Sequence, residues 1–373
     1  MKNLLLTLLL LLLSFASGEA APCRPDSLSI KIGQMLMIGF RGLDEHSEPT
    51  LEADIRERGI GGVVLFNYDV ASASPVRNIE SPEQVKRLVS GLQKMSALPL
   101  FIAIDQEGGR VSRLKPANGF PSSVSAAHLG TLDNADSTRL AAGKTADLLR
   151  QLKINMDLAP DVDLNTNPDN PVIGKLDRSF SKDPAIVARH ARIFVDEFHR
   201  AGIIAALKHF PGHGSSTKDT HKDFTDVTAT WSREELEPYR ELIRQGYDDP
   251  VMTAHVFHAG LDSLYPATLS KAIVGGILRG DLKFRGVVIS DDMQMRAIAD
   301  RYGLETAIRL AIEAGVDILL FGNNASAYDP NIAEKATRII RRLVDEKVIS
   351  PERIDHSYRR IMALKARTLY PPK

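Results

Sequence analysis

The feature that most constrains the fold is a regular alternation of short apolar runs with helical stretches along most of the chain. Eight of the runs are rich in Val, Ile and Leu, and several are continuously apolar rather than alternating. Continuous runs of this kind are typical of strands buried on both faces of a parallel sheet. The predicted strands are Gln34–Phe40, Gly61–Phe66, Leu100–Asp105, Asn155–Leu158, Ile203–Leu207, Val251–His255, Val287–Ser290 and Asp317–Phe321.

Amphipathic helices are predicted between these strands. The helix that begins at Pro184 has Asp183 as its expected N-cap. In the helix before it, Leu140, Leu148 and Leu149 are expected on the apolar side. The predicted helices are Glu83–Gln93, Ser137–Leu152, Pro184–Ala201, Arg233–Arg244, Ser270–Leu278, Leu304–Glu313, Ala333–Glu346 and Pro351–Lys365.

Eight strands, most of them followed by a helix, predict an α/β fold of the (β/α)8 TIM-type barrel kind. A doubly wound open sheet is the main alternative, but no glycine-rich dinucleotide fingerprint follows the first strand. The composition, 43% hydrophobic and 25% charged, is that of a globular domain. No shift in composition marks a second domain, so residues 21–373 are expected to form a single barrel domain.

The first 20 residues have the organisation of a secretory signal peptide. A positively charged start precedes the apolar run Leu4–Leu13, and small residues follow in Ser14–Ala21. The apolar run is too short to remain as a membrane-spanning helix, so we expect an exported protein, periplasmic or extracellular. Cys23 is the only cysteine, which excludes an intramolecular disulfide. It leaves membrane anchoring through a lipid open, although Pro22 fits a lipid-attachment site poorly.

Polar clusters follow the predicted strands at their C-terminal ends. They read IDQEGGRVSRL, LDRSF, KHFPGHGSSTKDTH and ISDDMQM. Because the strands of a barrel present these ends at one mouth, the clusters are expected to converge. The segment Lys208–His221 holds three histidines and an aspartate, and its glycines and proline exclude a helix. This segment is the strongest candidate for a loop that performs chemistry.

The motifs DQEGGRVSR, DRSF, KHFPGHG…DTH and SDDM resemble, in order and spacing, those of glycoside hydrolase family 3. The resemblance is to its β-N-acetylglucosaminidase (β-N-acetylhexosaminidase) branch, and it covers roughly residues 28 to 370. It implies a retaining exo-β-N-acetylglucosaminidase that acts on peptidoglycan- or chitin-derived fragments. The partner that it implies is a carbohydrate substrate, with no cofactor, no metal ion and no stable protein partner.

The same resemblance assigns roles to individual residues. Asp291 matches the nucleophile, and a retaining glycosidase needs such a carboxylate to form a glycosyl-enzyme. His221 matches the general acid/base, and Asp219 matches the carboxylate that orients it; this pair can transfer a proton near neutral pH. The sugar-binding positions, whose carboxylate and cations suit sugar hydroxyl groups, are matched by Asp105, Arg113, Arg178, Lys208 and His209.

The loop from Pro211 to about Thr225 is expected to be mobile without substrate and to close over it, because little apolar content pins it to the core. Within this loop, His213 is expected to brace the turn. His255 and His258, at and just after the end of the sixth strand, are expected to pack or to support the residues that contact substrate rather than to be catalysts, and no role is assigned to them. Asp291 has the alternative role of a helix cap. The five sugar-binding positions have the alternative role of a structural ion-pair network at the barrel rim, and Glu107 and Arg110 could form such a network.

Three other functions remain open. A metal-dependent hydrolase could use the histidines together with Asp291, but no His-x-His pair stands at a strand end. A family 3 β-glucosidase would generally take its acid/base from a second domain rather than from this loop. A non-catalytic sugar-binding barrel would be expected to lack Asp291 or His221. The chain has 47 lysine and arginine residues in total and 47 aspartate and glutamate residues in total, so its formal net charge is zero. The absence of a net positive charge argues against a nucleic-acid partner.

Overall fold

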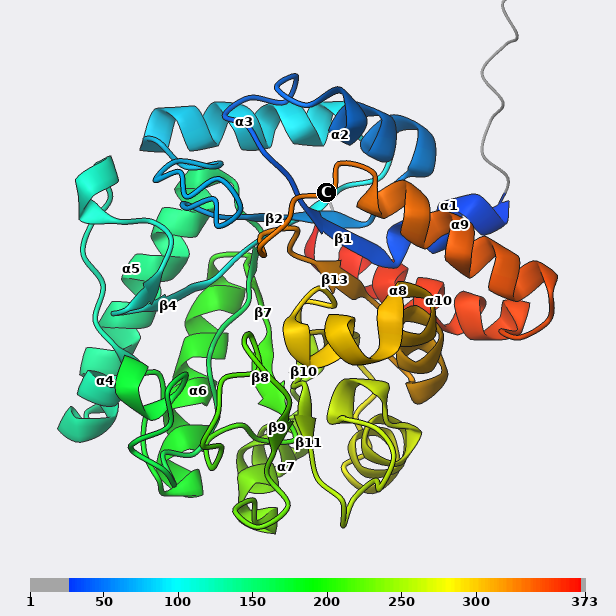
Figure 1. Ribbon diagram of the computed structural model, residues 1–373. Coiled ribbons are helices and arrows are strands. Elements are labelled where there is room, and N and C mark those ends of the chain that lie inside the picture. The colour runs from blue at the N-terminus through cyan, green and yellow to red at the C-terminus, as the bar shows by residue number, and fades with distance from the viewer. Residues whose placement is uncertain (1–26, 370–373) are drawn as a thin grey trace, which may run out of the picture.

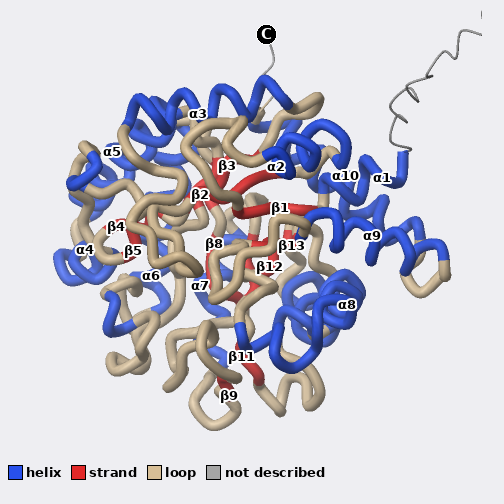
Figure 2. The backbone as a smooth tube through the Cα atoms, turned by 45° about the horizontal axis from the view of Figure 1, so that its top comes forward, coloured by secondary structure: helices blue, strands red, loops and turns tan. Residues whose placement is uncertain are grey.

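The computed structural model describes residues 27–369 (Figure 1). The predicted signal peptide, residues 1–20, and Cys23 lie outside the described residues. The strands lie in the middle of the molecule and the helices surround them (Figure 2). Between residues 27 and 369, no helix has the length and apolar character needed to cross a membrane.

The strands form two main parallel sheets, of six and three strands. The six-stranded sheet has the order β13-β1-β2-β3-β6-β7, and the three-stranded sheet has the order β12-β10-β8. Their bounds are β1 Leu36–Gly39, β2 Gly62–Leu65, β3 Phe101–Ile104, β6 Met156–Asp157, β7 Ile204–Ala205, β8 Leu207–Phe210, β10 Val251–Thr253, β12 Val288–Ser290 and β13 Leu319–Phe321.

Each of the eight predicted strands contains an observed strand. The fifth is divided at Ala206: β7 pairs with β6 on one side, and β8 pairs with β10 on the other. This stretch therefore belongs to both sheets. At the opposite junction a single bridge joins Ile289 to Ile318. Since the ladders are interrupted at both junctions, the structure establishes an α/β fold built on parallel sheets.

All eight predicted helices are found, most with small shifts of their ends. The helix predicted from Leu304 is the second part of α8, which begins at Arg296 and is interrupted at Gly303. The helix predicted from Arg233 begins with a 3-10 turn, Arg233–Leu236. Asp183 caps α6 as expected, because its Oδ1 accepts the amide of Ala185 at 2.8 Å. The helix predicted from Ser270 is a π-helix, Lys271–Asp281. The α-helices are α1 Ser27–Gln34, α2 Pro49–Ala53, α3 Pro82–Met95, α4 Ala126–Leu132, α5 Ala135–Leu152, α6 Pro184–Arg200, α7 Glu237–Arg244, α8 Arg296–Ala314, α9 Ile332–Asp345 and α10 Pro351–Thr368.

The prediction for Leu140 is wrong. Helix α5 packs beside α6, and its buried positions include Thr138, Ala142 and Leu149. Leu140 is two residues from both Thr138 and Ala142, which places it about 200° away around the helix axis. Its side chain is accordingly 60% exposed, while Leu149 is buried as expected.

Two short strand pairs were not expected from the sequence. β4 (Gln106–Gly108) and β5 (Val111–Ser112) form an antiparallel hairpin directly after β3. β9 (Thr225–Asp226) pairs with β11 (Val256–Phe257). The hairpin matters for function because it turns the DQEGGRVSR motif back on itself, so that its two ends can face the same space.

Candidate active site

The predicted site residues meet around one cavity of about 430 Å³ at the C-terminal ends of the strands. The convergence expected from the sequence is therefore confirmed. Asp219 does not line the cavity directly, but it is hydrogen-bonded to His221, which does. The predicted residues in the lining are Asp105, Arg113, Arg178, Lys208, His209, His221 and Asp291.

Asp105 follows β3 and is held by two cations. Its Oδ1 accepts from Lys208 Nζ at 2.7 Å, and its Oδ2 accepts from Arg113 Nη2 at 3.1 Å. Burial works to raise the pKa of Asp105, but Lys208 and Arg113 outweigh burial and hold this pKa well below its usual value. Asp105 is therefore an ionised acceptor whose position is fixed from both sides.

Glu107 was not among the predicted binding residues, yet it organises two of them. Its carboxylate accepts from Arg178 Nε at 2.9 Å and Nη2 at 2.7 Å, and it lies 2.6 Å from Lys208 Nζ. Glu107 thus forms an ion-pair network, as its alternative role predicted, but Arg110 is not part of it, because Arg110 contacts Asp177 at the surface. Burial opposes ionisation of Glu107, but Arg178 and Lys208 lower its pKa to about 2.

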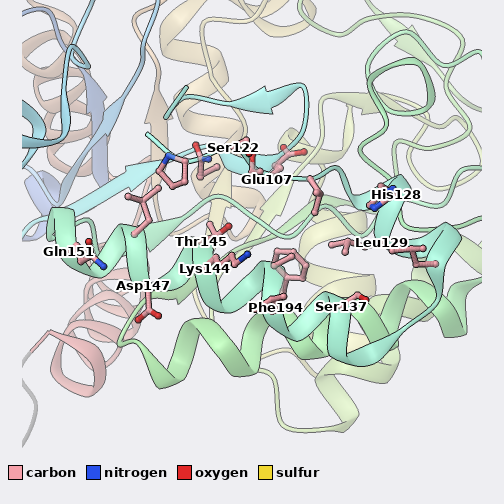
Figure 3. Close-up of a pocket in the computed structure, with 18 residues that line it drawn as sticks. Glu107, Ser122, His128, Leu129, Ser137, Lys144, Thr145, Asp147, Gln151 and Phe194 are labelled. Atoms are coloured by element: carbon pink, nitrogen blue, oxygen red, sulfur yellow. The ribbon is translucent and has the colours of Figure 1, made fainter. Parts of the chain in front are cut away.

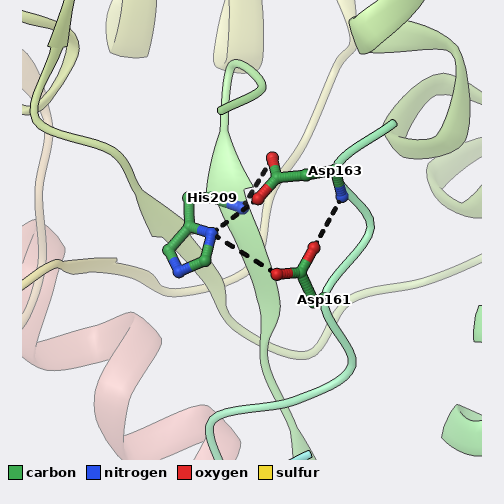
Figure 4. A group of neighbouring side chains, drawn as sticks. All are labelled: Asp161, Asp163 and His209. Atoms are coloured by element: carbon green, nitrogen blue, oxygen red, sulfur yellow. Dashed lines mark hydrogen bonds and ion pairs between the residues drawn. The ribbon is translucent and has the colours of Figure 1, made fainter. Parts of the chain in front are cut away.

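His209 lies beside two buried aspartates, Asp161 and Asp163 (Figure 4). Its Nδ1 is 2.7 Å from Asp163 Oδ2, and Arg178 Nη2 is 3.1 Å from its Nε2. Because a guanidinium can only donate, Nε2 is the acceptor and Nδ1 carries the proton that is donated to Asp163. Asp163 Oδ1 also accepts the backbone amide of His213 at 2.7 Å.

These three side chains also form a group that could in principle hold a metal ion, with ligand atoms within 4.8 Å of one another. The existing contacts of Asp161, Asp163 and His209 do not favour a bound metal ion. His209 and Asp163 are already hydrogen-bonded to each other, and Arg178 Nε lies 3.4 Å from Asp161 Oδ2. Burial, followed by the charge of Asp163, raises the pKa of Asp161 well above its usual value, which disfavours the ionised form that a metal ligand needs.

Asp291 stands at the end of β12 and is half-buried at the wall of the cavity. Helix α8 begins only at Arg296, with Met295 at its N-cap, so the alternative that Asp291 caps this helix is wrong. Burial works to raise the pKa of Asp291, but His255, His209 and His221 lower it below the usual value. The group is therefore an ionised carboxylate at the cavity wall.

The residue after Asp291 has a different environment. Asp292 Oδ1 accepts the amides of Gln294 and Gly322, each at 3.0 Å, which joins the loops after β12 and β13. Burial raises the pKa of Asp292 to about 6. His255 is buried, and its Nε2 lies 2.9 Å from the carbonyl oxygen of Asp292, so it packs against this turn.

His221 and Asp219 form the expected pair. His221 Nδ1 lies 2.9 Å from Asp219 Oδ1, which leaves Nε2 for proton exchange with a substrate. The surrounding protein displaces some water, which works to lower the pKa of His221. The hydrogen bond to Asp219 and the charge of Asp291 outweigh this effect and raise the pKa. The side chain of His221 remains 65% exposed, so it stands at the open side of the cavity.

The loop that carries this pair is divided into a buried and an exposed part. Residues 211–216 are buried, whereas most of 217–223 is exposed. The expectation that little pins the loop is therefore wrong for its first half. The expectation that His213 braces the turn is confirmed, since its ring lies 2.8 Å from Ser216 Oγ and 3.2 Å from Thr220 Oγ1.

A second cavity, of about 640 Å³, lies along the outward face of α5 (Figure 3). Leu129, Leu132, Leu140 and Leu148 contribute apolar surface, and Glu107 marks its boundary with the first cavity. None of the predicted site residues, all of which fall within the described part of the chain, lines this second cavity. Size alone does not identify the functional cavity.

Comparison with known proteins settles the family. The family model described as "Glycosyl hydrolase family 3 N terminal domain" matches residues 27–364. The chain belongs to glycoside hydrolase family 3. The motif resemblance seen in the sequence is thereby confirmed.

Several family members are similar over most of their length. A protein named "Beta-hexosaminidase" from Alkalilimnicola ehrlichii is 35% identical over 329 residues, covering 86% of this chain and 87% of its own. Another with the same name, from Tolumonas auensis, is 37% identical over 299 residues, covering 78% and 83%.

Solved structures agree. A glycoside hydrolase family 3 beta-N-acetylglucosaminidase from Paenibacillus matches with TM-score 0.84 and 37% identity, covering 94% of this chain and 64% of its own. Some relatives are longer than this chain: it spans 54% of the "Beta-hexosaminidase A" of Pseudoalteromonas piscicida, to which it is 34% identical, with 79% of this chain covered.

We predict that Asp157→Asn makes the protein more stable relative to wild type as the pH rises. Asp157 Oδ1 accepts the amide of Gln106 at 2.9 Å, while the buried Oδ2 has no partner among the described residues. Burial raises the pKa of Asp157 from 3.8 to about 8. Between these values the native state binds more protons than the unfolded state, so wild-type stability falls as the pH rises.

Asparagine resembles the protonated carboxyl group, so the variant should lack this fall. Urea unfolding of both proteins between about pH 5 and pH 9 measures the difference. Asp147→Asn, an exposed change on α5, is the matched control and should follow wild type. Parallel curves for wild type and Asp157→Asn would contradict the assignment.

Proposed function

We propose that the protein is a retaining exo-β-N-acetylglucosaminidase that releases terminal N-acetylglucosamine from peptidoglycan- or chitin-derived fragments. The observation that carries this proposal is the placement of Asp291 and His221 at one cavity, beside sugar-binding candidates that are held by ion pairs and hydrogen bonds. Relatives named beta-hexosaminidase and the solved beta-N-acetylglucosaminidase support the same activity. Residues 1–20 further support export as the destination.

The same proposal includes a closed (β/α)8 barrel in a single domain. The stretch from β7 to β8 belongs to both sheets, and the Ile289–Ile318 bridge lies at the other junction. These two contacts support a ring of eight strands. In such a ring the residues after each strand face one mouth, where the cavity lies.

The side chains that bind the substrate are preorganised: contacts within the protein hold them in position before a sugar binds. Asp105 accepts sugar hydroxyl donors, while Arg178 and Lys208 donate charge-assisted hydrogen bonds. Glu107 holds both of these cations, and Asp163 holds His209. Because these ion pairs are buried, the side chains lose little further freedom on binding, which favours precise placement of the anomeric carbon.

The chemistry divides between the two sides of the bound sugar. Asp291 attacks the anomeric carbon, and His221 Nε2 donates its proton to the departing glycosidic oxygen, which leaves a glycosyl-enzyme. Neutral His221 then takes a proton from the water that attacks this ester, and Asp291 is released. The lowered pKa of Asp291 and the raised pKa of His221 provide the charge states that the first step needs.

A panel of chromogenic glycosides tests the activity directly. We expect the N-acetylglucosaminide to be hydrolysed at least about tenfold more efficiently than the glucoside, xyloside and arabinoside, because a site that hydrogen-bonds a substrate group rejects analogues that lack it. The measurement is kcat/KM for each substrate. Preference for the glucoside would instead assign the protein to the glucosidase-like members of the family.

The nucleophile can be identified by chemical trapping. A mechanism-based fluorosugar should label wild-type protein at Asp291, as read by peptide mass spectrometry, and Asp291→Ala should give no adduct. Turnover should fall by several orders of magnitude, because only positioning and electrostatics remain. Asp177→Asn, a surface change, is the control. Labelling at any other residue would contradict the role of Asp291.

The acid role of His221 predicts a dependence on the leaving group. His221→Ala should depress turnover of a natural disaccharide far more than glycosylation by an activated aryl substrate, whose leaving group departs without a proton. Asp219→Ala should act in the same direction but more mildly, because Asp219 only orients the imidazole. Pre-steady-state rates separate glycosylation from hydrolysis of the intermediate. Equal losses on both substrates would leave His221 as a binding residue.

A further inference from the structure

The acid/base pair lies on an exposed stretch with one buried residue inside it. Thr220, between Asp219 and His221, is 2% exposed, whereas Lys218 and Lys222 on either side are exposed. We propose that His213 is a positioning residue that holds Thr220 and thereby fixes where both members of the pair stand over the cavity. This proposal rests on the proposed function of His221.

The backbone of His213 is held in place by hydrogen bonds, which fixes the ring that contacts Thr220. Its amide donates to Asp163 Oδ1 at 2.7 Å, and its carbonyl accepts from Asn170 Nδ2 at 2.7 Å. The next amide, of Gly214, donates to Glu235 Oε2 at 3.1 Å. Two separate segments therefore hold this short stretch of backbone in place: the connection that carries Asp163 and Asn170, and the turn that carries Glu235.

Close packing fixes the same stretch sterically. A Cβ atom on Gly214 would lie 1.7 Å from the carbonyl oxygen of Leu164. One on Gly212, which has a φ of +124°, would lie 2.4 Å from Glu235 Oε2. Only glycine allows the backbone to approach these neighbours so closely, so the loop cannot shift here without loss of contacts.

The imidazole of His213 connects this fixed stretch of backbone to Thr220. Nδ1 lies 2.8 Å from Ser216 Oγ, and Nε2 lies 3.2 Å from Thr220 Oγ1. Burial lowers the pKa of His213 to about 4, so the ring is neutral near pH 7, with one donor and one acceptor nitrogen. Both contacts are satisfied when the protonated nitrogen donates to one hydroxyl oxygen and the other nitrogen accepts from the second hydroxyl group.

Thr220 also connects to the nucleophile's side of the cavity. Its carbonyl oxygen accepts the amide of Ala297 at 3.4 Å, in the first turn of α8. The segment between β12 and this helix carries Asp291. The His213–Thr220 contact therefore sets the position of the proton donor relative to the nucleophile, although neither His213 nor Thr220 lines the cavity.

Paired substitutions test the two ends of the imidazole separately. In His213→Gln the amide reaches the place of Nε2, so the contact to Thr220 is kept. In His213→Asn the shorter amide reaches only the place of Nδ1, so that contact is lost. Thr220→Val removes the hydroxyl group from the other side, and Thr220→Ser restores it.

We expect His213→Asn and Thr220→Val to lower kcat/KM for a disaccharide by roughly 10- to 100-fold, the scale of an ångström-sized misplacement. Glycosylation by an activated aryl substrate should change much less. His213→Gln and Thr220→Ser should recover most of the disaccharide activity. The double variant His213→Asn/Thr220→Val should be no worse than either single one, since both break one contact.

Thr230→Val, an exposed change further along the same connection, is the matched control and should follow wild type on both substrates. Equal losses on the two substrates, no loss, or additive losses in the double variant would overturn the role of His213. If His213→Asn fails to fold, the Thr220 pair alone decides by the same criteria. His221→Ala is measured in parallel: if it shows no leaving-group dependence, the proposed function fails first, and this inference falls with it.

Discussion

Lys208 and Arg178 are buried cations, and Glu107 lies between them. A charge without its partner in the interior would destabilise the fold by about 3–5 kcal/mol, so the three side chains depend on one another. They come from β8, from the segment before α6, and from the β4–β5 hairpin. The ion pairs that place the sugar-binding groups therefore also join three distant parts of the chain, and the site forms as the fold forms.

Five aspartate and glutamate side chains lie near these cations, and their pKa values show how the charge of the site is balanced. Asp105, Glu107 and Asp163 are ionised because cations or histidines face them. Asp157 and Asp161 have few such partners, and burial raises the pKa of each. Five carboxyl groups can therefore share a small volume, because burial favours the protonated form of two of them, Asp157 and Asp161. The ionised ones are those that line the cavity or hold a side chain that lines it.

The strands, and the gathering of the predicted residues at one cavity, could be predicted from the sequence for one reason. Apolar runs such as residues 287–289 are buried on both faces, and the candidate site residues follow them directly. Glu107 and Asn170 gave no comparable signal. Glu107 contacts Arg178, which is 71 positions further along the chain, and Asn170 contacts His213, which is 43 positions further along. No local sequence pattern encodes such contacts. The β4–β5 hairpin and the exposure of Leu140 were missed because both depend on packing between elements.

Asp163 joins two functions that are usually considered separately. One carboxylate oxygen holds His209 at the cavity, and the other accepts the amide of His213 in the loop that leads to His221. In the proposed mechanism, recognition of the glycone and delivery of the proton therefore both depend on Asp163. A substitution that moves His209, and so changes the preference for the sugar, would also move the loop that carries His221. Natural variants are therefore expected to change sugar preference and the rate of proton transfer to the leaving group together.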